Sequence, residues 1–470
     1  MEVIHLSVEC FPIAKVGGLA DVVGALPKYQ RALGIDAKVV MPWFDCPFVK
    51  EQQFEVVTTG SFFQGSDELQ YEIHKEESDV LGFPLFLIKI PGKLDREEVY
   101  CYPDEAEQWI AFQHAFLHWI QNHGIYPSII HCHDHHVGLI AFLLQHGVDF
   151  RNLADIRTIF TVHNGQYQGW MNWSKGILLP SFDTWKWGLL DWDGVINPLA
   201  AAIKCSDAYT TVSDGYLNEL FIDANGLQAL FNAESGKAYG IVNGIDTAYW
   251  NPSSDQLIER NYNRVTVNRG KEENKQALCK QFNLPLAFPL ISFIGRFAKE
   301  KGADLLFDIC VKLFSVRQNV SVFILGSGDR EIQNGLIELQ LQFEGKINLF
   351  FGYDEKLAHQ VYAASDMLLM PSRVEPCGLN QLYALKYGTI PIVRGIGGLR
   401  DTVVDVLEEG YGFVFEKLNA DEAVKTIERS LDMYTDNKIW KGIRKKAMQL
   451  DFSWKRSAQK YVELYNQLLK

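Results

Sequence analysis

The chain of 470 residues lacks several features that would place it in a specialised class of protein. Its eight cysteines are scattered and include no C-x-x-C pair, a pattern typical of reduced thiols rather than of a disulfide framework. No apolar run is long enough to span a bilayer, and the first residues lack a basic stretch. We therefore expect neither a membrane anchor nor a signal peptide, and we predict a cytoplasmic protein.

Basic charge is also scarce. The chain has 45 lysines and arginines against 58 aspartates and glutamates, which gives a formal net charge of −13. Nucleic-acid binding needs a basic surface, so we expect no nucleic-acid partner. An anionic small ligand would depend on a few local cations, and the candidates are Lys15, Arg296 and Lys301.

The pattern that is present is an alternation of apolar, strand-like runs with helical stretches. The length exceeds what one hydrophobic core serves, so two domains are expected. The strand-like runs are residues 3–8, 37–41, 84–90, 128–131, 158–162, 209–212, 239–242, 290–294, 320–325, 347–351, 367–370 and 390–393. Helical stretches between many of them predict an α/β fold with parallel sheets. The polar segment from 251 to about 270 is the predicted linker.

Two glycine-rich segments follow predicted strands and open predicted helices. One is Lys15-Val16-Gly17-Gly18-Leu19-Ala20-Asp21, and the other spans residues 371–381. A helix that begins after a strand points free N–H groups and a partial positive charge at one spot. One such corner in each half predicts a phosphate-bearing ligand held between two domains. At the first segment, a solvated lysine beside a glycine with positive φ would give the same pattern.

Charged residues follow two other strands. Arg296 and Lys301 come after the run 290–294, where two cations would stabilise a leaving diphosphate without a metal. Glu375 precedes a helix that runs to Lys386, and its carboxylate would accept hydrogen bonds from sugar hydroxyls. Without a ligand, Arg296 and Lys301 would simply belong to a solvated basic loop, and Glu375 would be an acid that caps a helix.

The segment 131–136, which reads HCHDHH, ends another predicted strand. Four histidines and an aspartate suggest a metal cluster, but alternate side chains of a strand face opposite sides and need not converge. We expect no metal site and retain Asp134 as a polar candidate in the same layer as His163. Five tryptophans beyond His163 would either stack on sugar rings or serve ordinary packing; they are Trp170, Trp173, Trp185, Trp187 and Trp192.

Together these segments resemble bacterial glycogen synthases and plant starch synthases. The matching segments are residues 15–21, 131–139, 161–169, 242–246, 295–302 and 371–403. The resemblance implies a GT-B fold, with Rossmann-like domains at 1–250 and 251–452 whose parallel sheets face a deep cleft. A C-terminal helix at 453–470 is expected to cross back to the first domain. The implied reaction transfers glucose from ADP-glucose to the non-reducing end of an α-1,4-glucan, with retention and without a cofactor.

The resemblance also implies roles for individual residues. The expected catalytic set is Glu375, His163, Asp134, Arg296 and Lys301. The expected substrate-binding residues are Lys15, Gly17, Gly18, Asp21, Gly378, Leu379 and Gly398. Departures from the family pattern at Asn380 and Ile396 leave the choice between ADP-glucose and UDP-glucose open.

Three alternatives remain at this stage. A different GT-B transferase is the first, although Tyr383 occupies the position where a broader group of such enzymes carries a second glutamate. A metal-dependent hydrolase that uses the segment 131–136 is the second. A catalytically silent glucan-binding protein is the third, and the intact set of charged residues argues against it. The sequence leaves the oligomeric state open.

Overall fold

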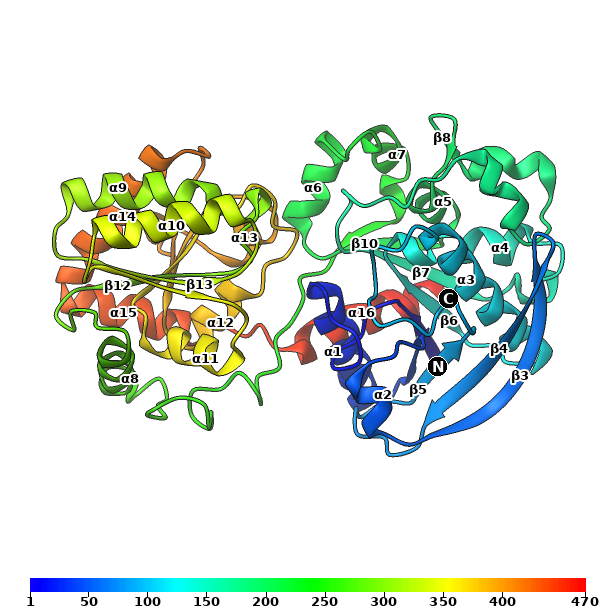
Figure 1. Cartoon of the computed structure of the whole chain (residues 1–470), viewed down its shortest axis with the longest axis horizontal. Coiled ribbons are helices and arrows are strands. Elements are labelled where there is room, and N and C mark those ends of the chain that lie inside the picture. The colour runs from blue at the N-terminus through cyan, green and yellow to red at the C-terminus, as the bar shows by residue number, and fades with distance from the viewer. The chain divides into compact units, whose positions relative to one another are not determined.

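The computed structural model describes residues 1–470 and divides them into two compact units (Figure 1). Unit 1 contains Met1–Gly244 and Trp454–Lys470, and unit 2 contains Ile245–Ser453. The chain therefore leaves unit 1 after Gly244 and returns to it at Trp454. The sequence-based division placed its domain boundaries after residues 250 and 452. None of the helices combines the length and the apolar character needed to cross a membrane.

Unit 1 is built on a nine-stranded sheet with the order β11-β10-β7-β6-β1-β2-β5-β4-β3. Its strands are β1 (Glu2–Leu6), β2 (Asp36–Pro42), β3 (Phe54–Gln64), β4 (Asp67–Glu76), β5 (Leu85–Lys89), β6 (Ile129–His133), β7 (Arg157–Val162), β10 (Ala208–Thr211) and β11 (Ala238–Gly240). A separate ribbon pairs β8 (Asp191–Trp192) with β9 (Val195–Ile196). Strand β4 is antiparallel to both β3 and β5, and the other pairs in the large sheet are parallel.

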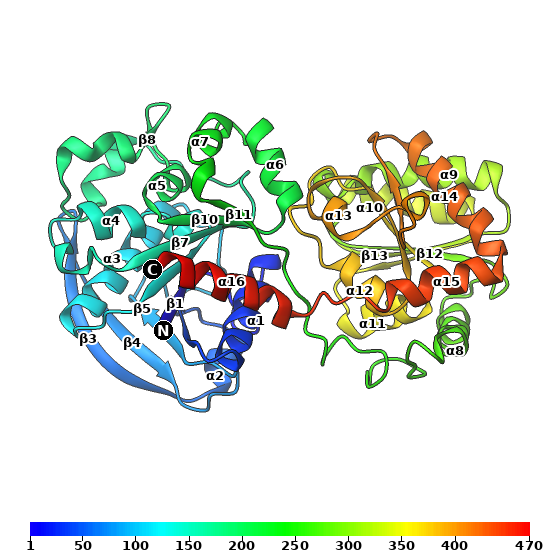
Figure 2. The same ribbon diagram turned by 180° about the vertical axis from the view of Figure 1, so that it is seen from behind.

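The helices of unit 1 include one from the far end of the chain. They are α1 (Gly18–Ala32), α2 (Pro47–Glu51), α3 (Glu105–Asn122), α4 (Ile140–His146), α5 (Pro198–Cys205), α6 (Asp214–Ile222), α7 (Gln228–Ala233) and α16 (Trp454–Leu468). Helix α16, red in Figure 2, lies beside α1. Both helices pack on the central strands in one apolar cluster that includes Val3, Leu26 and Tyr461.

Unit 2 is built on a six-stranded parallel sheet with the order β14-β13-β12-β15-β16-β17. Its strands are β12 (Leu290–Ile294), β13 (Ser321–Gly326), β14 (Ile347–Phe351), β15 (Met367–Met370), β16 (Ile390–Arg394) and β17 (Phe413–Phe415). Its helices are α8 (Val267–Gln281), α9 (Leu306–Val316), α10 (Arg330–Gln342), α11 (Glu355–Ala364), α12 (Asn380–Lys386), α13 (Gly397–Thr402), α14 (Ala420–Thr435) and α15 (Asn437–Ala447).

The sheet of unit 2 is buried on both faces, which explains its uninterrupted apolar runs. In β12, Ile291 and Phe293 belong to the core cluster that contains α9, α10, α14 and α15. Leu290 points to the other face and joins the cluster that contains residues of α8 and α11. Because successive side chains of a strand alternate between faces, a strand covered on both sides must be apolar throughout.

Two parts of the fold differ from the sequence-based prediction. The hairpin β3–β4 was not predicted, because β3 mixes polar residues with exposed apolar ones, such as Phe63 at 65% exposure. The predicted linker from 251 to about 270 is instead packed within unit 2. Its Tyr262 is 2% exposed and donates a hydrogen bond to the carbonyl of Tyr387, and its Asp255 is 6% exposed and contacts His359.

Candidate functional site

The candidate site in unit 1 lies beyond the carboxyl ends of β1, β6 and β7, which are neighbours in the sheet. Asp134 follows β6 directly, and His163 follows β7 directly. The segment from Lys15 to Gly18 connects β1 to α1. Parallel strands deliver their carboxyl ends to the same edge of a sheet, so this edge is where ligands of α/β folds bind.

Asp134 is fixed by its backbone and by its neighbour on the next strand. Its φ of 60° is unusual for a residue other than glycine, although aspartate tolerates it better than most. Its Oδ1 accepts a hydrogen bond of 2.7 Å from the backbone N–H of His163. Burial raises the pKa of the Asp134 carboxyl to about 7, and the hydrogen bonds from the His163 and Asn164 backbones oppose this rise.

His163 is 8% exposed and neutral. Burial lowers the pKa of its imidazole to about 3, so the ring holds one proton across the physiological range. Its Nε2 lies 3.0 Å from Nδ1 of His133, behind the strand ends. Its Nδ1 has no hydrogen-bond partner in the chain and is not sealed from solvent. A neutral ring in this position can form a hydrogen bond with a polar ligand without contributing charge.

The glycines of the 15–18 segment are not required by the fold. Gly17 has φ of −139°, which any residue adopts, and it precedes α1 without a side-chain cap. A Cβ atom added at Gly17 or at Gly18 would meet nothing within 4 Å. The sequence-based alternative of a positive φ at Gly17 is therefore wrong. Open space in front of uncapped helical N–H groups suits the close approach of an anion.

Lys15 and Asp21 form an ion pair of 2.7 Å between Nζ and Oδ1. The side chains remain 36% and 28% exposed, so the pair is open to solvent and contributes little to stability. The Nζ of Lys15 also lies 5.3 Å from the ring centroid of Phe11. The lysine is thus held at the start of α1 while a ligand can still reach its charge.

In unit 2 the corresponding site lies beyond β12, β15 and β16, which are also neighbours. Glu375 is 5% exposed, and its two carboxylate oxygens have different partners. Oε1 lies 2.7 Å from Nζ of Lys301, and Oε2 accepts a hydrogen bond of 2.9 Å from the hydroxyl of Ser372. The structure therefore brings together Lys301 and Glu375, which are 74 positions apart in the sequence.

Arg296 is more exposed than Lys301. Its guanidinium pairs with the carboxylate of Glu300, and its side chain is 64% exposed. The carbonyl of Glu300 accepts hydrogen bonds from the backbone N–H groups of Arg373 and Val374. These bonds fix the segment that carries Arg296 and Lys301 against the segment that carries Glu375.

Three further predicted residues lie in the second glycine-rich segment and at the start of α13. Gly378 has φ of 72°, a conformation that favours glycine, and Leu379 is the N-cap residue of α12. A Cβ atom at Gly398 would lie 2.2 Å from the carbonyl oxygen of Cys377. Gly398 donates its backbone N–H to the carbonyl of Glu375 over 3.0 Å. Gly378 and Gly398 therefore have structural reasons to be glycine.

Comparison with known proteins covers the whole chain. The profile of a family described as "Starch synthase catalytic domain" matches residues 2–233, and that of "Glycosyl transferases group 1" matches residues 274–446. The glycogen synthase of Flavobacterium johnsoniae is 48% identical over 471 residues, which cover 100% of both chains. The glycogen synthase of Geobacillus thermodenitrificans is 37% identical over 100% of this chain and 98% of its own length.

The chain belongs to the glycogen synthase and starch synthase family. A structure titled "Catalytic domain of Starch Synthase IV from Arabidopsis thaliana bound to ADP and acarbose" superposes with a TM-score of 0.89. It is 32% identical, and the match covers 100% of this chain and 99% of that one. A sucrose-phosphate synthase from Thermosynechococcus elongatus, 19% identical with a TM-score of 0.64, shares the fold. The predicted family, GT-B fold class and hexosyltransferase activity are confirmed.

Sequence reasoning missed one acidic residue of this glycogen synthase family member. Glu9 is 4% exposed, and its Oε2 accepts hydrogen bonds of 2.7 Å and 2.9 Å from the backbone N–H groups of Val16 and Gly17. Its Oε1 accepts a hydrogen bond of 2.6 Å from the hydroxyl of Tyr100. Glu9 thereby shapes the loop before α1. The only sequence signal was an acid placed soon after a buried strand.

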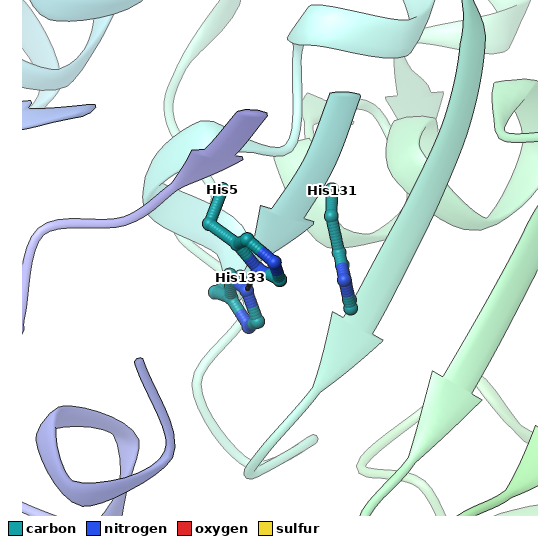
Figure 3. A group of neighbouring side chains, drawn as sticks. All are labelled: His5, His131 and His133. Atoms are coloured by element: carbon teal, nitrogen blue, oxygen red, sulfur yellow. Dashed lines mark hydrogen bonds between the residues drawn. The ribbon is translucent and has the colours of Figure 1, made fainter. Parts of the chain in front are cut away.

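Three histidines of this family member meet inside unit 1, as Figure 3 shows. Ligand atoms of His5, His131 and His133 lie within 4.8 Å of one another, and all three rings are buried. The sequence left open whether residues of the HCHDHH segment converge, and His131 and His133 do, because residues two apart on a strand share a face. Every ring nitrogen of the three already has a hydrogen-bond partner. The cluster is therefore built as a hydrogen-bond network, and a metal ion would have to break it.

The five tryptophans beyond His163 have different surroundings. Trp170, Trp185 and Trp187 are 57%, 72% and 55% exposed, so they lie open to solvent. Trp173 is less exposed and donates its indole N–H to Asp191 over 2.7 Å. The ring of Trp192 faces the ammonium of Lys204, 5.3 Å from its centroid. None of these contacts belongs to the site residues described above.

Proposed function

We propose that this glycosyltransferase moves glucose from ADP-glucose to the non-reducing end of an α-1,4-glucan. The observation that carries the proposal is the buried carboxylate of Glu375, held between Lys301 and Ser372 beyond β15. It offers an acceptor for sugar hydroxyls beside a cation suited to phosphate. The Arabidopsis starch synthase structure that this chain matches over its whole length holds ADP, which supports an adenine nucleotide in the donor.

The roles of the charged residues follow from their chemistry. Lys301 and Arg296 bind the diphosphate and stabilise the negative charge that it gains on leaving. Glu375 accepts hydrogen bonds from the transferred glucose. Each of these three groups has a partner of opposite charge in the chain, which holds it in place before the ligand binds.

In unit 1 the open glycines and the lysine act on the donor. Gly17 and Gly18 leave room for close approach, and Lys15 and Asp21 lie at the start of α1. Asp134 and His163 contact the transferred sugar. Gly378, Leu379 and Gly398 in unit 2 shape the loops that face the donor, chiefly through their backbone conformation.

The proposed chemistry retains the configuration at the anomeric carbon by attack on the same face. The bond from C1 to the phosphate oxygen breaks, the bond from C1 to the acceptor oxygen forms, and the acceptor proton moves to the departing phosphate. A covalent intermediate would need a free nucleophilic carboxylate. The oxygens of Glu9 accept three hydrogen bonds, which hold this carboxylate in the loop before α1 and give it a structural role.

The proposed compartment is the cytoplasm. All eight cysteines are free thiols, and seven of them are buried. Such a set of unpaired thiols suits a reducing environment.

Nucleotide release tests the proposal. The purified chain is incubated with ADP-glucose or UDP-glucose, with and without glycogen, and the released nucleoside diphosphate is measured. We expect glycogen-dependent release of ADP, and elongation of the outer chains confirms the end that is extended. Preference for UDP-glucose would correct the donor, and the absence of glycogen-dependent release from both donors would refute the proposal.

A further inference from the structure

A continuous chain of buried hydrogen bonds connects His163 to the C-terminal helix. Nε2 of His163 lies 3.0 Å from Nδ1 of His133, and Nε2 of His133 lies 3.0 Å from Nδ1 of His5. Nε2 of His5 lies 2.7 Å from the amide oxygen of Gln30 on α1. The amide nitrogen of Gln30 then donates to the hydroxyl of Tyr465 on α16 over 2.8 Å.

The chain continues beyond Tyr465 into the sheet. The hydroxyl of Tyr465 lies 2.7 Å from Nδ1 of His131, and Nε2 of His131 lies 2.6 Å from the hydroxyl of Thr161. The hydroxyl of Thr161 lies 2.7 Å from that of Thr210. All of the side chains in this hydrogen-bond network except His163 are 0% exposed, so water does not compete for their protons.

The four imidazoles of this hydrogen-bond network are neutral near pH 7. Burial lowers the pKa of His5 to about 4 and that of His163 to about 3, and it lowers the pKa values of His131 and His133 well below the usual range. A neutral imidazole has one N–H donor and one lone pair. Each ring must therefore donate at one nitrogen and accept at the other.

The amide of Gln30 determines the direction in which every ring donates. Its oxygen can only accept, so Nε2 of His5 carries the proton and Nδ1 of His5 accepts. Nε2 of His133 must then donate to His5, which leaves Nδ1 of His133 as the acceptor. Nε2 of His163 donates to that atom, and the lone pair of His163 is left on Nδ1.

We propose that Gln30 and Tyr465 are positioning residues that select the Nε2–H tautomer of His163. The selected tautomer presents Nδ1 as a hydrogen-bond acceptor, which suits a hydroxyl group of the transferred sugar. The identity of that sugar rests on the proposed function, whereas the tautomer does not. A reversed amide at Gln30 would reverse each donor in turn and would present an N–H at Nδ1 instead.

The tautomer can be observed directly in the full-length chain. Histidine labelled with ¹⁵N gives a protonated and an unprotonated ring nitrogen in long-range proton–nitrogen spectra, and a His163→Gln variant assigns the signals. We expect His163 in the wild type to be protonated at Nε2 and unprotonated at Nδ1 near pH 7. A proton on Nδ1 in the wild type would overturn the proposal, whether or not any variant folds and whether or not the chain is active.

Two variants test the selection itself. Tyr465→Phe removes the hydroxyl that holds Gln30, and Gln30→Met removes the amide while keeping its approximate volume. We expect both to broaden or reverse the His163 pattern and to lower kcat about three- to tenfold, as the loss of one hydrogen bond would. Tyr461→Phe removes a hydroxyl from the same helix, outside this chain of bonds, and should preserve both the spectrum and kcat.

Monodeoxy analogues of the donor separate positioning from general loss of stability. With the analogue that lacks the hydroxyl facing Nδ1, the wild type and Tyr465→Phe should turn over at equal rates. If Tyr465→Phe lowers kcat by the same factor with every analogue, the proposed role at the sugar is refuted. Unchanged spectra and kcat in both variants would refute the selection by Gln30 and Tyr465.

Discussion

Glu375 is a single residue whose charge and position are set by two different neighbours. Lys301 balances its charge, and Ser372 orients the second oxygen. Glu375→Gln keeps the shape of the side chain and removes the charge. We expect kcat for glucosyl transfer to fall by at least about 100-fold, because a preorganised electrostatic contact is lost.

The measurement for Glu375→Gln is the steady-state rate of nucleotide release at saturating donor and glycogen. Glu408→Gln provides the matched control, since Glu408 is an exposed acid in unit 2 and should show wild-type kcat. Turnover of Glu375→Gln within threefold of the wild type would remove Glu375 from the catalytic set.

The raised pKa of Asp134 makes stability depend on pH. The folded chain keeps this proton up to about pH 7, whereas the unfolded chain releases it near 3.8. Between these values the folded state binds more protons, so increasing pH lowers the free energy of unfolding. We expect Asp134→Asn to lose less unfolding free energy than the wild type between about pH 5 and pH 7. Asparagine also tolerates the positive φ of this position.

Urea unfolding at several pH values measures this effect. The quantity of interest is the difference in unfolding free energy between Asp134→Asn and the wild type, which should grow as the pH rises to about 7. Exposed Asp155 gives the matched control, for which we expect the pH dependence of the wild type. A difference that stays constant with pH would contradict the raised pKa.

At the scale of elements, a substitution in the turn before α1 should change donor binding without changing stability. A Cβ atom at Gly17 meets no neighbour and needs no unusual φ, so Gly17→Ala should leave the melting temperature within about 2 °C of the wild type. It would occupy the space proposed for the donor phosphates. We expect KM for ADP-glucose to rise about tenfold or more.

Gly236→Ala is the control for Gly17→Ala, because its added Cβ also meets nothing within 4 Å. It should leave both the melting temperature and KM unchanged. An unchanged KM in Gly17→Ala would mean that the donor does not approach this turn.

At the turn that contains Gly302, in contrast, the fold itself requires glycine. Its φ is 67°, and an added Cβ would lie 1.9 Å from the carbonyl oxygen of Pro371, which begins the segment carrying Glu375. Gly345 also has a positive φ, 77°, but its Cβ would meet nothing. We expect Gly345→Ala to cost about 1 kcal/mol from backbone strain alone.

Gly302→Ala should cost at least about 2 kcal/mol more than Gly345→Ala, because backbone atoms must also move. Chemical denaturation of both variants measures the difference. Equal costs would show that the two segments are not packed as the structure describes.

Elements differ in how much of their structure the sequence predicts. Strands such as β12 were predictable because burial on both faces leaves an uninterrupted apolar run. The hairpin β3–β4 was not, since exposed residues interrupt its pattern. The charged residues proposed for the site were selected by their place after strands, and their roles stay predictions. Glu9 could not be predicted, because its role depends on how the loop before α1 folds back onto it and on distant Tyr100. The contacts of His133 could not, because they join side chains from separate strands.

At the scale of the whole molecule, unit 2 is inserted into unit 1. Ile245 and Ser453 are bridge partners, so the chain enters and leaves unit 2 at adjacent points. In unit 1, the hydroxyl of Ser457 donates to the carbonyl of Val242 over 2.7 Å. The two ends of the insertion therefore lie close together in unit 1 as well.

We expect residues 245–453 to fold alone, with a cooperative thermal transition, because their sheet and both of its core faces are complete. Residues 1–244 should not, because α16 covers part of their core. Joining 1–244 to 454–470 by a short flexible linker should restore cooperative unfolding, measured by circular dichroism. A folded 1–244 fragment would contradict this view of α16.

The discontinuity of unit 1 also has a consequence for synthesis on the ribosome. Unit 2 is encoded without interruption, so all of its strands and helices are translated before α16. At about 5–20 residues per second, residues 245–470 take roughly 10–45 s to make. For that time the apolar surface that Tyr461 and Leu464 later cover lacks its native partner. The nascent first unit should therefore be a substrate for chaperones until α16 leaves the ribosome.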